Sequence, residues 1–235
     1  MKIVPFGDSA LLVNFEQKID IVINNQVLSL FKQLQEVKEV TFLIPAYCSL
    51  TVGFGDQTSF KTLSKQIEEI TSKSQSTDLN LNPRLIEIPV CYEAPHALDM
   101  SEVTEKTGLT QQEIIDTHCL ETYKVYMLGF VAGFAYLGSL PEQLFCPRKT
   151  DPRKEVLAGS VGLAGLQTGI YPANAPGGWQ IIGRTPIPTF NPKAENPTLF
   201  KAGDAVKFKS ISSVEFEEIE KQVSSNTFNL EEYYG

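Results

Sequence analysis

Glycine is concentrated in one stretch of this chain, Tyr123 to Pro186, and this concentration restricts how the stretch can fold. Ten of the chain's sixteen glycines lie there, in about a quarter of its length. Glycine weakens helices and strands, so it collects at turns with positive φ and where a ligand or another backbone comes close. Aromatic side chains are interleaved with these glycines, namely Tyr126, Phe130, Phe134, Tyr136, Tyr171 and Trp179. Either they wall a concave, partly apolar pocket, or the glycines form the corners of a tightly turned β-barrel.

The overall charge limits the kinds of partner that the chain can bind. Its 235 residues suffice for one large domain or two small ones, and a hydrophobic content of 42% allows an ordinary core. The net charge of -8 and the pI near 4.9 argue against nucleic acid, which needs a basic face. They argue equally against an anionic membrane surface.

The N-terminus and the cysteines predict a cytoplasmic protein. Met1 to Pro5 lack the apolar run of a signal peptide, and no stretch of the chain reaches transmembrane length. The four cysteines are widely spaced and contain no C-x-x-C pair. We therefore expect reduced thiols, without a disulfide framework or a metal site.

Residues 1–80 have the pattern of a small α/β domain. Apolar residues recur at helical spacing from Asp20 to Gln35, and Asp56 to Ser59 can cap a second helix. Each helix follows a pair of short apolar runs, and the predicted strands are Lys2–Phe6, Ala10–Phe15, Val37–Ile44 and Ser49–Phe54. This order predicts a ferredoxin-like sheet that is covered on one face. The polar stretch Thr71 to Pro83 is the best candidate for a linker.

Residues 85–235 form a second predicted domain, which is rich in β-strands. An alternating strand, Leu85–Val90, precedes two helices, Ser101–Thr107 and Thr110–His118, and Thr110 with Glu113 makes a capping box. Short strands between Gly and Pro turns follow, at Val125–Leu128, Val156–Ala158, Gly165–Tyr171, Gln180–Gly183 and Ala205–Lys209, before a helix at Glu215–Gln222. Such strands indicate a barrel or a sandwich, so the expected fold class of the chain is α+β.

His118 is the histidine best placed for chemistry. It ends an amphipathic helix, where the macrodipole favours the charged imidazolium. It is therefore a candidate acid, base or anion holder. The alternative is a polar residue that only satisfies the carbonyls at the helix end. His96 lies in a proline-rich turn, and we expect no functional role for it.

Three arginines stand among glycines and prolines rather than on a charged helix face. Arg148 and Arg153 each follow a proline that fixes φ, and Arg184 follows Gly183. A fixed guanidinium suits carboxylate or phosphate recognition. The alternative is pairing with a nearby acid such as Asp151 or Glu155, and we favour that alternative for Arg153.

One short strand offers several groups for a polar ligand. Because side chains alternate along a strand, Gln167, Gly169 and Tyr171 face the same side. The turn before Trp179 would bring a large ring to the same rim. The chain has no phosphate-binding loop, dinucleotide fingerprint or G-x-S-x-G nucleophile turn. The chain thus has a stretch typical of a binding pocket but no recognisable set of catalytic residues. We therefore expect that it forms one half of a site, and that a second protein completes it.

The motifs of the second domain, taken together, resemble those of the 5-oxoprolinase B-subunit family. That family also carries the names allophanate hydrolase subunit 1 and sporulation-kinase inhibitor. The similarity is specific from about residue 85 to 210 and looser before that. It rests on Tyr123–Phe130, Gly133–Gly138, Pro147–Arg148, Pro152–Arg153, Ala158–Val161, Gln167–Pro172, Pro176–Trp179, Ile182–Pro186 and Gly203–Phe208.

The resemblance implies a ferredoxin-like domain at residues 1–80 and a cyclophilin-like β-barrel at residues 85–235. It further implies two partners, the 5-oxoprolinase C subunit, which is itself cyclophilin-like, and the A subunit. The assembly would use ATP with Mg²⁺ as a co-substrate, without a tightly bound cofactor, to open 5-oxoproline to glutamate. Without these partners the B subunit would be inactive. Two other functions remain open, namely an inhibitor that binds a sensor histidine kinase through the barrel, and a subunit of a hydrolase for allophanate or another urea-derived amide.

Within that scheme each candidate residue receives an expected role. Phosphorylation of the lactam oxygen makes the ring carbon electrophilic. His118 then suits proton transfer, and Arg148 and Arg184 suit phosphate or carboxylate. The predicted substrate-binding residues are Tyr123, Phe134, Tyr136, Gln167, Tyr171, Trp179 and Arg184. The chain departs from the family pattern at residues 93–100, at Val131–Ala132 and at Leu157. An altered substrate or a regulatory role is the alternative that these departures suggest.

Overall fold

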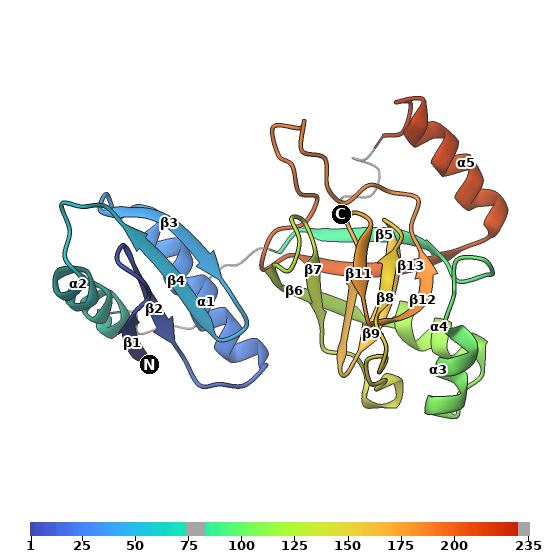
Figure 1. Cartoon of the computed structure of the whole chain (residues 1–235), viewed down its shortest axis with the longest axis horizontal. Coiled ribbons are helices and arrows are strands. Elements are labelled where there is room, and N and C mark those ends of the chain that lie inside the picture. Colours follow the sequence, from blue (N-terminus) through green and yellow to red (C-terminus); the bar gives the residue numbers. More distant parts are fainter. Residues whose placement is uncertain (74–82, 230–235) are drawn as a thin grey trace. The chain divides into compact units, whose positions relative to one another are not determined.

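The computed structural model describes residues 1–73 and 83–229 of the chain, shown in Figure 1. These residues belong to two compact units, Met1–Asn82 and Pro83–Gly235. The predicted linker begins inside a helix, because Thr71 to Lys73 complete the last turn of α2. The rest of that predicted linker, up to residue 82, lies outside the described residues.

The first unit is a four-stranded antiparallel sheet with two helices, as predicted. The strand order is β1-β2-β4-β3. This is the strand arrangement of a ferredoxin-like sheet, with one permutation: the strand that comes last in the ferredoxin-like chain order comes first here, as β1. Its elements are β1 (Lys2–Pro5), β2 (Ala10–Asn14), α1 (Ile21–Leu34), β3 (Val40–Pro45), β4 (Ser49–Phe54) and α2 (Phe60–Lys73).

Local signals in the sequence begin both helices of this unit. The Asp20 carboxylate accepts hydrogen bonds from the Val22 and Ile23 N–H groups at the start of α1. The hydroxyl of Ser59 accepts from the Thr62 N–H at the start of α2, 3.2 Å away. The apolar stripes of both helices pack on the inward side chains of the central strands. This core contains Leu11, Val13, Val27, Leu30, Leu34, Leu50, Val52, Phe54, Leu63 and Ile67.

The second unit is a closed barrel with helices at its ends, so the α+β fold class is confirmed. The barrel order is β10-β7-β6-β13-β5-β12-β9, and a separate pair joins β8 to β11. The strands are β5 (Leu85–Cys91), β6 (Thr122–Leu128), β7 (Ala135–Gly138), β8 (Arg153–Val156), β9 (Ser160–Ala164), β10 (Gln167–Ile170), β11 (Ala175–Gly177), β12 (Gln180–Arg184) and β13 (Ala205–Ile211).

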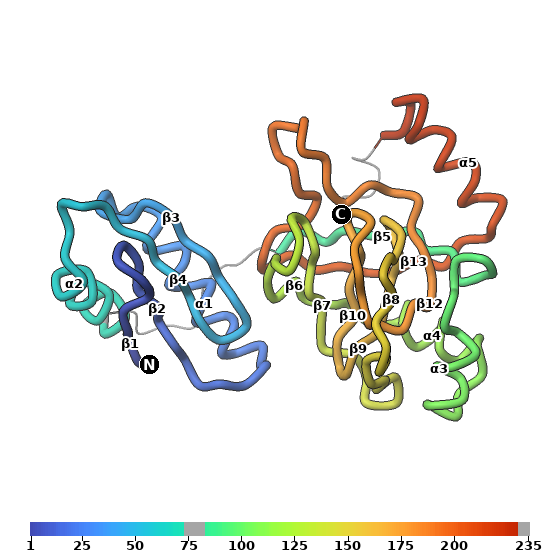
Figure 2. Tube along the Cα trace, viewed as in Figure 1, coloured from blue at the N-terminus to red at the C-terminus, as the bar shows by residue number. Residues whose placement is uncertain are grey.

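One parallel pair closes this otherwise antiparallel barrel. Strand β13 lies between β5 and β6, parallel to β5 and antiparallel to β6. The first and last strands of the unit are therefore direct neighbours. The segment between β12 and β13, drawn in orange in Figure 2, projects beyond the barrel strands.

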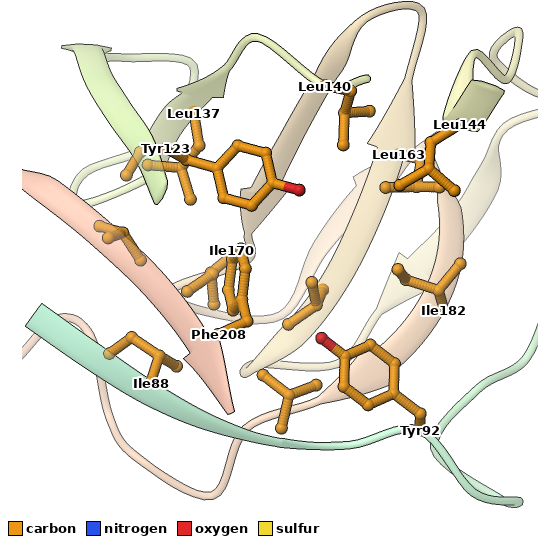
Figure 3. Close-up of a cluster of buried hydrophobic side chains, with 14 of the residues drawn as sticks. Ile88, Tyr92, Tyr123, Leu137, Leu140, Leu144, Leu163, Ile170, Ile182 and Phe208 are labelled. Atoms are coloured by element: carbon orange, nitrogen blue, oxygen red, sulfur yellow. The ribbon is translucent and has the colours of Figure 1, made fainter. Parts of the chain in front are cut away.

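The interior of the barrel is filled with side chains. Figure 3 shows that aliphatic residues such as Ile88, Leu163 and Ile182 and the rings of Tyr92, Tyr123 and Phe208 line the same interior. All of these side chains are almost completely buried. The barrel interior is therefore a packed core, and a ligand has to bind outside it.

Helices cover the ends of the barrel. α3 (Met100–Thr107) and α4 (Gln111–Leu120) form the predicted helical hairpin, and the capping box of Thr110 and Glu113 is confirmed. The short helix η1 (Glu142–Leu144) follows β7, and α5 (Ser213–Ser224) begins with a second capping box. No helix in residues 1–73 or 83–229 has both the length and the apolar character needed to span a membrane.

Candidate functional site

A pocket on the outside of the barrel gathers most of the predicted substrate-binding residues. Its volume is about 420 Å³. Strands β7, β9, β10 and β11 and the segment before β8 supply its walls. The lining residues are Phe130, Phe134, Tyr136, Pro147, Arg148, Ala164, Gly165, Gln167, Tyr171, Gly177 and Trp179.

The aromatic wall is a small core of its own, separate from the barrel interior. The ring of Phe134 stands edge-on to Tyr171 and Trp179, with centroids 5.2 and 5.3 Å apart. Tyr136 meets Trp179 at 5.9 Å in a similar geometry. These distances and angles are favourable for aromatic pairs. The wall therefore keeps a fixed shape without a ligand.

Two glycines make this packing possible. A Cβ atom at Gly169 would lie 3.0 Å from the Trp179 ring and 3.1 Å from the Phe134 ring. At Gly177 the hydroxyl of Tyr171 occupies the place that a Cβ would need. The close approach of other groups thus explains glycine at both positions.

Strand β10 divides its side chains between the pocket and the barrel interior, as strand alternation predicts. Gln167 lies on the pocket side, together with Tyr171 just after the strand. Thr168 is completely buried on the opposite side. The strand therefore connects the pocket wall to the core.

Arg148 lines the pocket with an exposed side chain. Among residues 1–73 and 83–229 its guanidinium forms no ion pair. Burial raises the pKa of the Tyr136 and Tyr171 hydroxyls, and the charge of Arg148 offsets part of that rise. A guanidinium with unused donors, next to aromatic rings, is suited to a carboxylate or phosphate group of a ligand.

A buried carboxylate holds the segment that carries Arg148. Asp99 accepts two hydrogen bonds from Arg153, at 2.8 and 2.6 Å, and one from Lys149 at 3.0 Å. It also accepts from the Ile181 N–H of β12 at 2.7 Å. Burial raises the pKa of Asp99, but these bonds outweigh burial and leave the pKa below its ordinary value. Arg153 is thus structural, as we expected, although its partner is Asp99 rather than Asp151 or Glu155.

Glu102 of α3 extends this network toward the pocket. It accepts hydrogen bonds from Lys106, Lys149 and Gln180, and the first two lower its pKa to about 2. Gln180 also donates to the Pro147 carbonyl at 3.2 Å. The residue before Arg148 is therefore tied to β12 and α3.

His118 lies in the barrel interior, not in the pocket. Its side chain is completely buried and stacks on Phe208 at 4.4 Å. The Tyr92 hydroxyl lies 2.7 Å from Nδ1, and the Thr168 hydroxyl lies 2.9 Å from Nε2. Burial lowers the pKa of His118 to about 3. The expectation of a charged imidazolium was wrong, because desolvation exceeds the effect of the helix dipole.

Tyr123 also points into the core and not into the pocket. It is 1% exposed, and its hydroxyl donates to the His118 carbonyl at 3.1 Å. Arg184 lies apart from the pocket as well, since its Nε donates to the Ala158 carbonyl at 2.9 Å. Its guanidinium lies over the ring of Phe216 and 3.8 Å from the Glu220 carboxylate. These contacts use the groups that we had expected to bind the substrate.

Burial of His118 predicts a stability loss on mild acidification. The unfolded chain gains a proton near the ordinary pKa of 6.5, whereas the folded pKa is about 3. The stabilisation is complete above the unfolded pKa and is lost as the pH falls toward the folded one. From about pH 8 to about pH 5 the free energy of unfolding should fall by about 2 kcal/mol.

Urea unfolding, followed by the fluorescence of the only tryptophan, Trp179, measures this loss in the barrel unit. His118→Gln should remove most of the pH dependence. The comparison variant is His96→Gln. The pKa of His96 is also lowered, mainly by burial and then by the charge of Arg184. That variant should keep most of the dependence. An unchanged slope in His118→Gln would contradict the prediction.

Five further residues line the pocket that were not among the predicted substrate-binding residues. They are Phe130, Pro147, Ala164, Gly165 and Gly177. Phe130 has a φ of 66°, a conformation that is unusual for an aromatic residue. Phe130 was among the aromatic residues considered as possible pocket walls, and its place between Gly129 and Gly133 permits a sharp turn that exposes the ring.

Exposed apolar side chains surround the pocket. Cys146 pairs with Gly165 in an antiparallel bridge, so their chain neighbours Phe145 and Leu166 lie at the same edge of the pocket. These two residues are 53% and 41% exposed, and Phe130 is 61% exposed. An apolar rim of this kind is typical of a surface that another protein covers.

The pocket has no metal-binding cluster. Within the part of the chain that the structure describes, no three His, Cys, Asp or Glu side chains come close enough together to hold an ion. The groups available for chemistry in the pocket are a guanidinium, an amide and phenol hydroxyls. These groups bind and orient a ligand, and none of them is an evident nucleophile or general base.

Comparison with known proteins places these features in context. Residues 1–200 match the family described as carboxyltransferase domain, subdomain C and D. The chain is similar to a 5-oxoprolinase B subunit of Bacillus subtilis (strain 168), with 40% identity over an alignment of length 228 that covers 92% of this chain and 95% of that protein.

Two solved structures are also similar. The crystal structure of a conserved uncharacterized protein, PH0987 from Pyrococcus horikoshii, has 40% identity and a TM-score of 0.56, and the match covers 92% of this chain and 100% of that one. The structure of TTHA0988 has 30% identity and a TM-score of 0.76. That match covers 87% of this chain but 40% of TTHA0988, so this chain spans less than half of that protein's length.

Proposed function

This chain belongs to the 5-oxoprolinase B-subunit family, within the carboxyltransferase subdomain C and D family, and we propose that it works as the B subunit of an ATP-dependent 5-oxoprolinase. In this role it acts with the A and C subunits to convert 5-oxoproline to L-glutamate. The observation that carries the proposal is the 40% identity to a 5-oxoprolinase B subunit over 95% of that protein's length. We assign the site to the barrel domain, residues 85–235, and treat residues 1–80 as a separate domain.

The chemistry of the substrate fits the pocket. 5-Oxoproline is a small ring with a planar amide and one carboxylate. The faces of Phe134 and Trp179 suit the ring, and the Gln167 amide can exchange hydrogen bonds with the lactam. The Arg148 guanidinium suits the carboxylate, or a phosphate on the lactam oxygen. A pocket with apolar walls and few polar groups of this kind both binds and orients a small ligand.

Orientation is the contribution that we assign to this chain. Phosphorylation of the lactam oxygen by ATP makes the ring carbon electrophilic enough for attack by water. Arg148 would stabilise negative charge on the substrate, while the aromatic wall would exclude bulk solvent from the ring. His118 holds Thr168 of β10 from the core side, so we propose that it positions the pocket wall instead of transferring a proton to the substrate.

The missing catalytic groups would come from partner proteins. The apolar rim of Phe130, Phe145 and Leu166 is open, and we assign it to the contact with the C subunit. Docking there would close the pocket and supply a nucleophile or base that the described lining of the pocket does not provide. ATP with Mg²⁺ would act as co-substrate of the complete assembly. The four cysteines are free thiols, in keeping with a cytoplasmic protein.

Turnover by the reconstituted assembly tests this proposal. We expect 5-oxoproline-dependent ATP hydrolysis when this chain is mixed with its cognate A and C subunits, and none with the chain alone. The control replaces this chain with a 5-oxoprolinase B subunit of known activity. If only the control mixture is active, the proposed function is wrong. Turnover of allophanate, or inhibition of a sensor histidine kinase, would then identify the correct alternative.

A further inference from the structure

The loop between β6 and β7 contains an unusual backbone turn. The Val131 N–H donates to the Gly129 carbonyl at 2.8 Å, which closes a turn of three residues with Phe130 at its centre. The φ of Phe130 is 66°. A three-residue turn with a positive φ at its centre is the rare and strained form of the γ-turn. The backbone of Phe130 is therefore held in a conformation that is unfavourable for any residue with a side chain.

Further backbone hydrogen bonds hold this turn in place. The Gly129 N–H donates to the Phe134 carbonyl at 3.1 Å, and the Phe134 N–H donates to the Val131 carbonyl at 3.1 Å. The second of these bonds closes a four-residue turn, in which Gly133 supplies a φ of 84°. The position of Phe130 is thus fixed by the loop and does not depend on a ligand.

The ring of Phe130 lies at the mouth of the aromatic pocket. It lines the pocket and is T-shaped to the ring of Phe134, with centroids 5.8 Å apart and an angle of 87° between the planes. Phe134 and Tyr171 are each 1% exposed and Trp179 is 6% exposed, whereas Phe130 is 61% exposed. Phe130 is therefore the part of the aromatic lining that solvent reaches when the pocket is empty.

Folding of the chain does not account for a phenylalanine at this position. The exposed ring gains little from burial, and glycine at position 130 would avoid the strain of the positive φ. Strained backbone conformations that persist in a fold are concentrated at active sites and ligand clamps. The combination of strain, exposure and a place in the pocket lining therefore indicates that the ring of Phe130 acts on a ligand.

We propose that Phe130 is a substrate-contacting residue, whose ring covers the ring of 5-oxoproline at the mouth of the pocket. The choice of ligand rests on the proposed function. Arg148 holds the charged group of the substrate, and Phe130 contacts the apolar methylene groups of its ring. Because the turn fixes Phe130 before the substrate arrives, this contact costs little conformational freedom on binding. Phe130 therefore contributes to substrate affinity, in addition to its place in the apolar rim.

Titration of the full-length chain with 5-oxoproline, followed by the fluorescence of Trp179 in the pocket wall, tests this role. Phe130→Ala should weaken binding about tenfold, which is the upper value for one aromatic contact. Phe130→Tyr keeps the ring and should restore the affinity. Phe6→Ala is the matched control, because Phe6 is a phenylalanine of the first unit that is 56% exposed and does not line the pocket. Equal affinity of Phe130→Ala and the unmodified chain would overturn the proposal.

A second pair of variants tests the strained turn. Phe130→Gly and Phe130→Ala both lack the ring, but glycine adopts a positive φ without strain. The melting temperature of Phe130→Gly should therefore exceed that of Phe130→Ala by about 3 °C, while both variants bind 5-oxoproline equally weakly. A melting temperature of Phe130→Ala that matches or exceeds that of Phe130→Gly would show that the turn is not strained, and would overturn the argument for the role of the ring.

Capture of the purified C subunit by the same variants separates contact with the substrate from contact with the partner. Normal affinity of Phe130→Ala for 5-oxoproline, together with weaker capture, would assign the ring to the partner and overturn the proposal. If binding depends on Phe130 but the assembly does not turn 5-oxoproline over, the proposed function is wrong and the substrate contact stands. If the free chain shows no saturable binding of 5-oxoproline while the assembly is active, the contact is wrong and the proposed function stands.

Discussion

Replacing Arg148 with alanine is expected to lower 5-oxoproline-dependent ATP hydrolysis by the assembled complex about 100-fold, without destabilising the chain. The guanidinium lines the pocket and pairs with no acid in the described residues, so its loss leaves no buried charge behind. Loss of a hydrogen-bonded contact with a charged substrate group costs about 1.5–3 kcal/mol, and the upper part of that range corresponds to about 100-fold.

Steady-state kinetics with this variant separates two roles of Arg148. An increase in KM alone would show that Arg148 holds the substrate carboxylate, whereas a fall in kcat would show that it stabilises charge that develops during the reaction. Lys154→Ala is the matched control, because Lys154 is an exposed cation of the following strand, β8, and does not line the pocket. Normal turnover by Arg148→Ala would remove this residue from the site.

Asp99→Asn is expected to destabilise the barrel unit by about 3 kcal/mol, because it removes the buried carboxylate that pairs with Arg153 and leaves Lys149 with Glu102 alone. The carboxylate of Asp99 is 3% exposed, while Arg153 and Lys149 are 26% and 20% exposed. Solvent can therefore reach the two cations in part, which places the effect at the lower end of the range for buried ion pairs. The same change frees the segment before β8, so turnover by the complex should fall as well.

Urea unfolding monitored by Trp179 fluorescence measures this effect. Asp151→Asn is the control, since Asp151 is an exposed acid of the same segment, and it should change the free energy of unfolding by less than about 0.5 kcal/mol. Equal stability of the two variants would mean that the network of Asp99 does not hold the segment.

Much of the fold could be predicted from local patterns in the sequence. Helical spacing and capping residues located α1, α2 and the α3–α4 hairpin, because these signals act within a few residues. Strands β7, β9 and β11 were not predicted. Strand β9 contains Ser160 and Gly162, which are weak strand formers, and the strand is stable because it pairs with both β10 and β12. Pairing across the sheet overrides the low strand propensity of glycine and serine.

Residue type and strand alternation were sufficient to predict five of the substrate-binding residues that line the pocket. Phe134, Tyr136, Gln167, Tyr171 and Trp179 line it together with Arg148. His118, Tyr123 and Arg184 lie elsewhere, because their placement depends on which side of the barrel wall a residue faces. No local pattern marked Asp99 as the partner of Arg153, since 54 residues separate the two. Only the closed barrel brings them together.

The position of β13 has a consequence for how the protein is made. This strand fits between β5 and β6, and it pairs residue by residue with a strand that precedes it by 120 residues, as Ala205 with Leu85. On the ribosome, the first unit can therefore fold as soon as its own strands emerge, whereas the barrel stays open until residues 205–211 have been translated. Until that moment the edges of β5 and β6 are unpaired and exposed to aggregation. The barrel unit is thus the part of the nascent chain that most needs protection by chaperones.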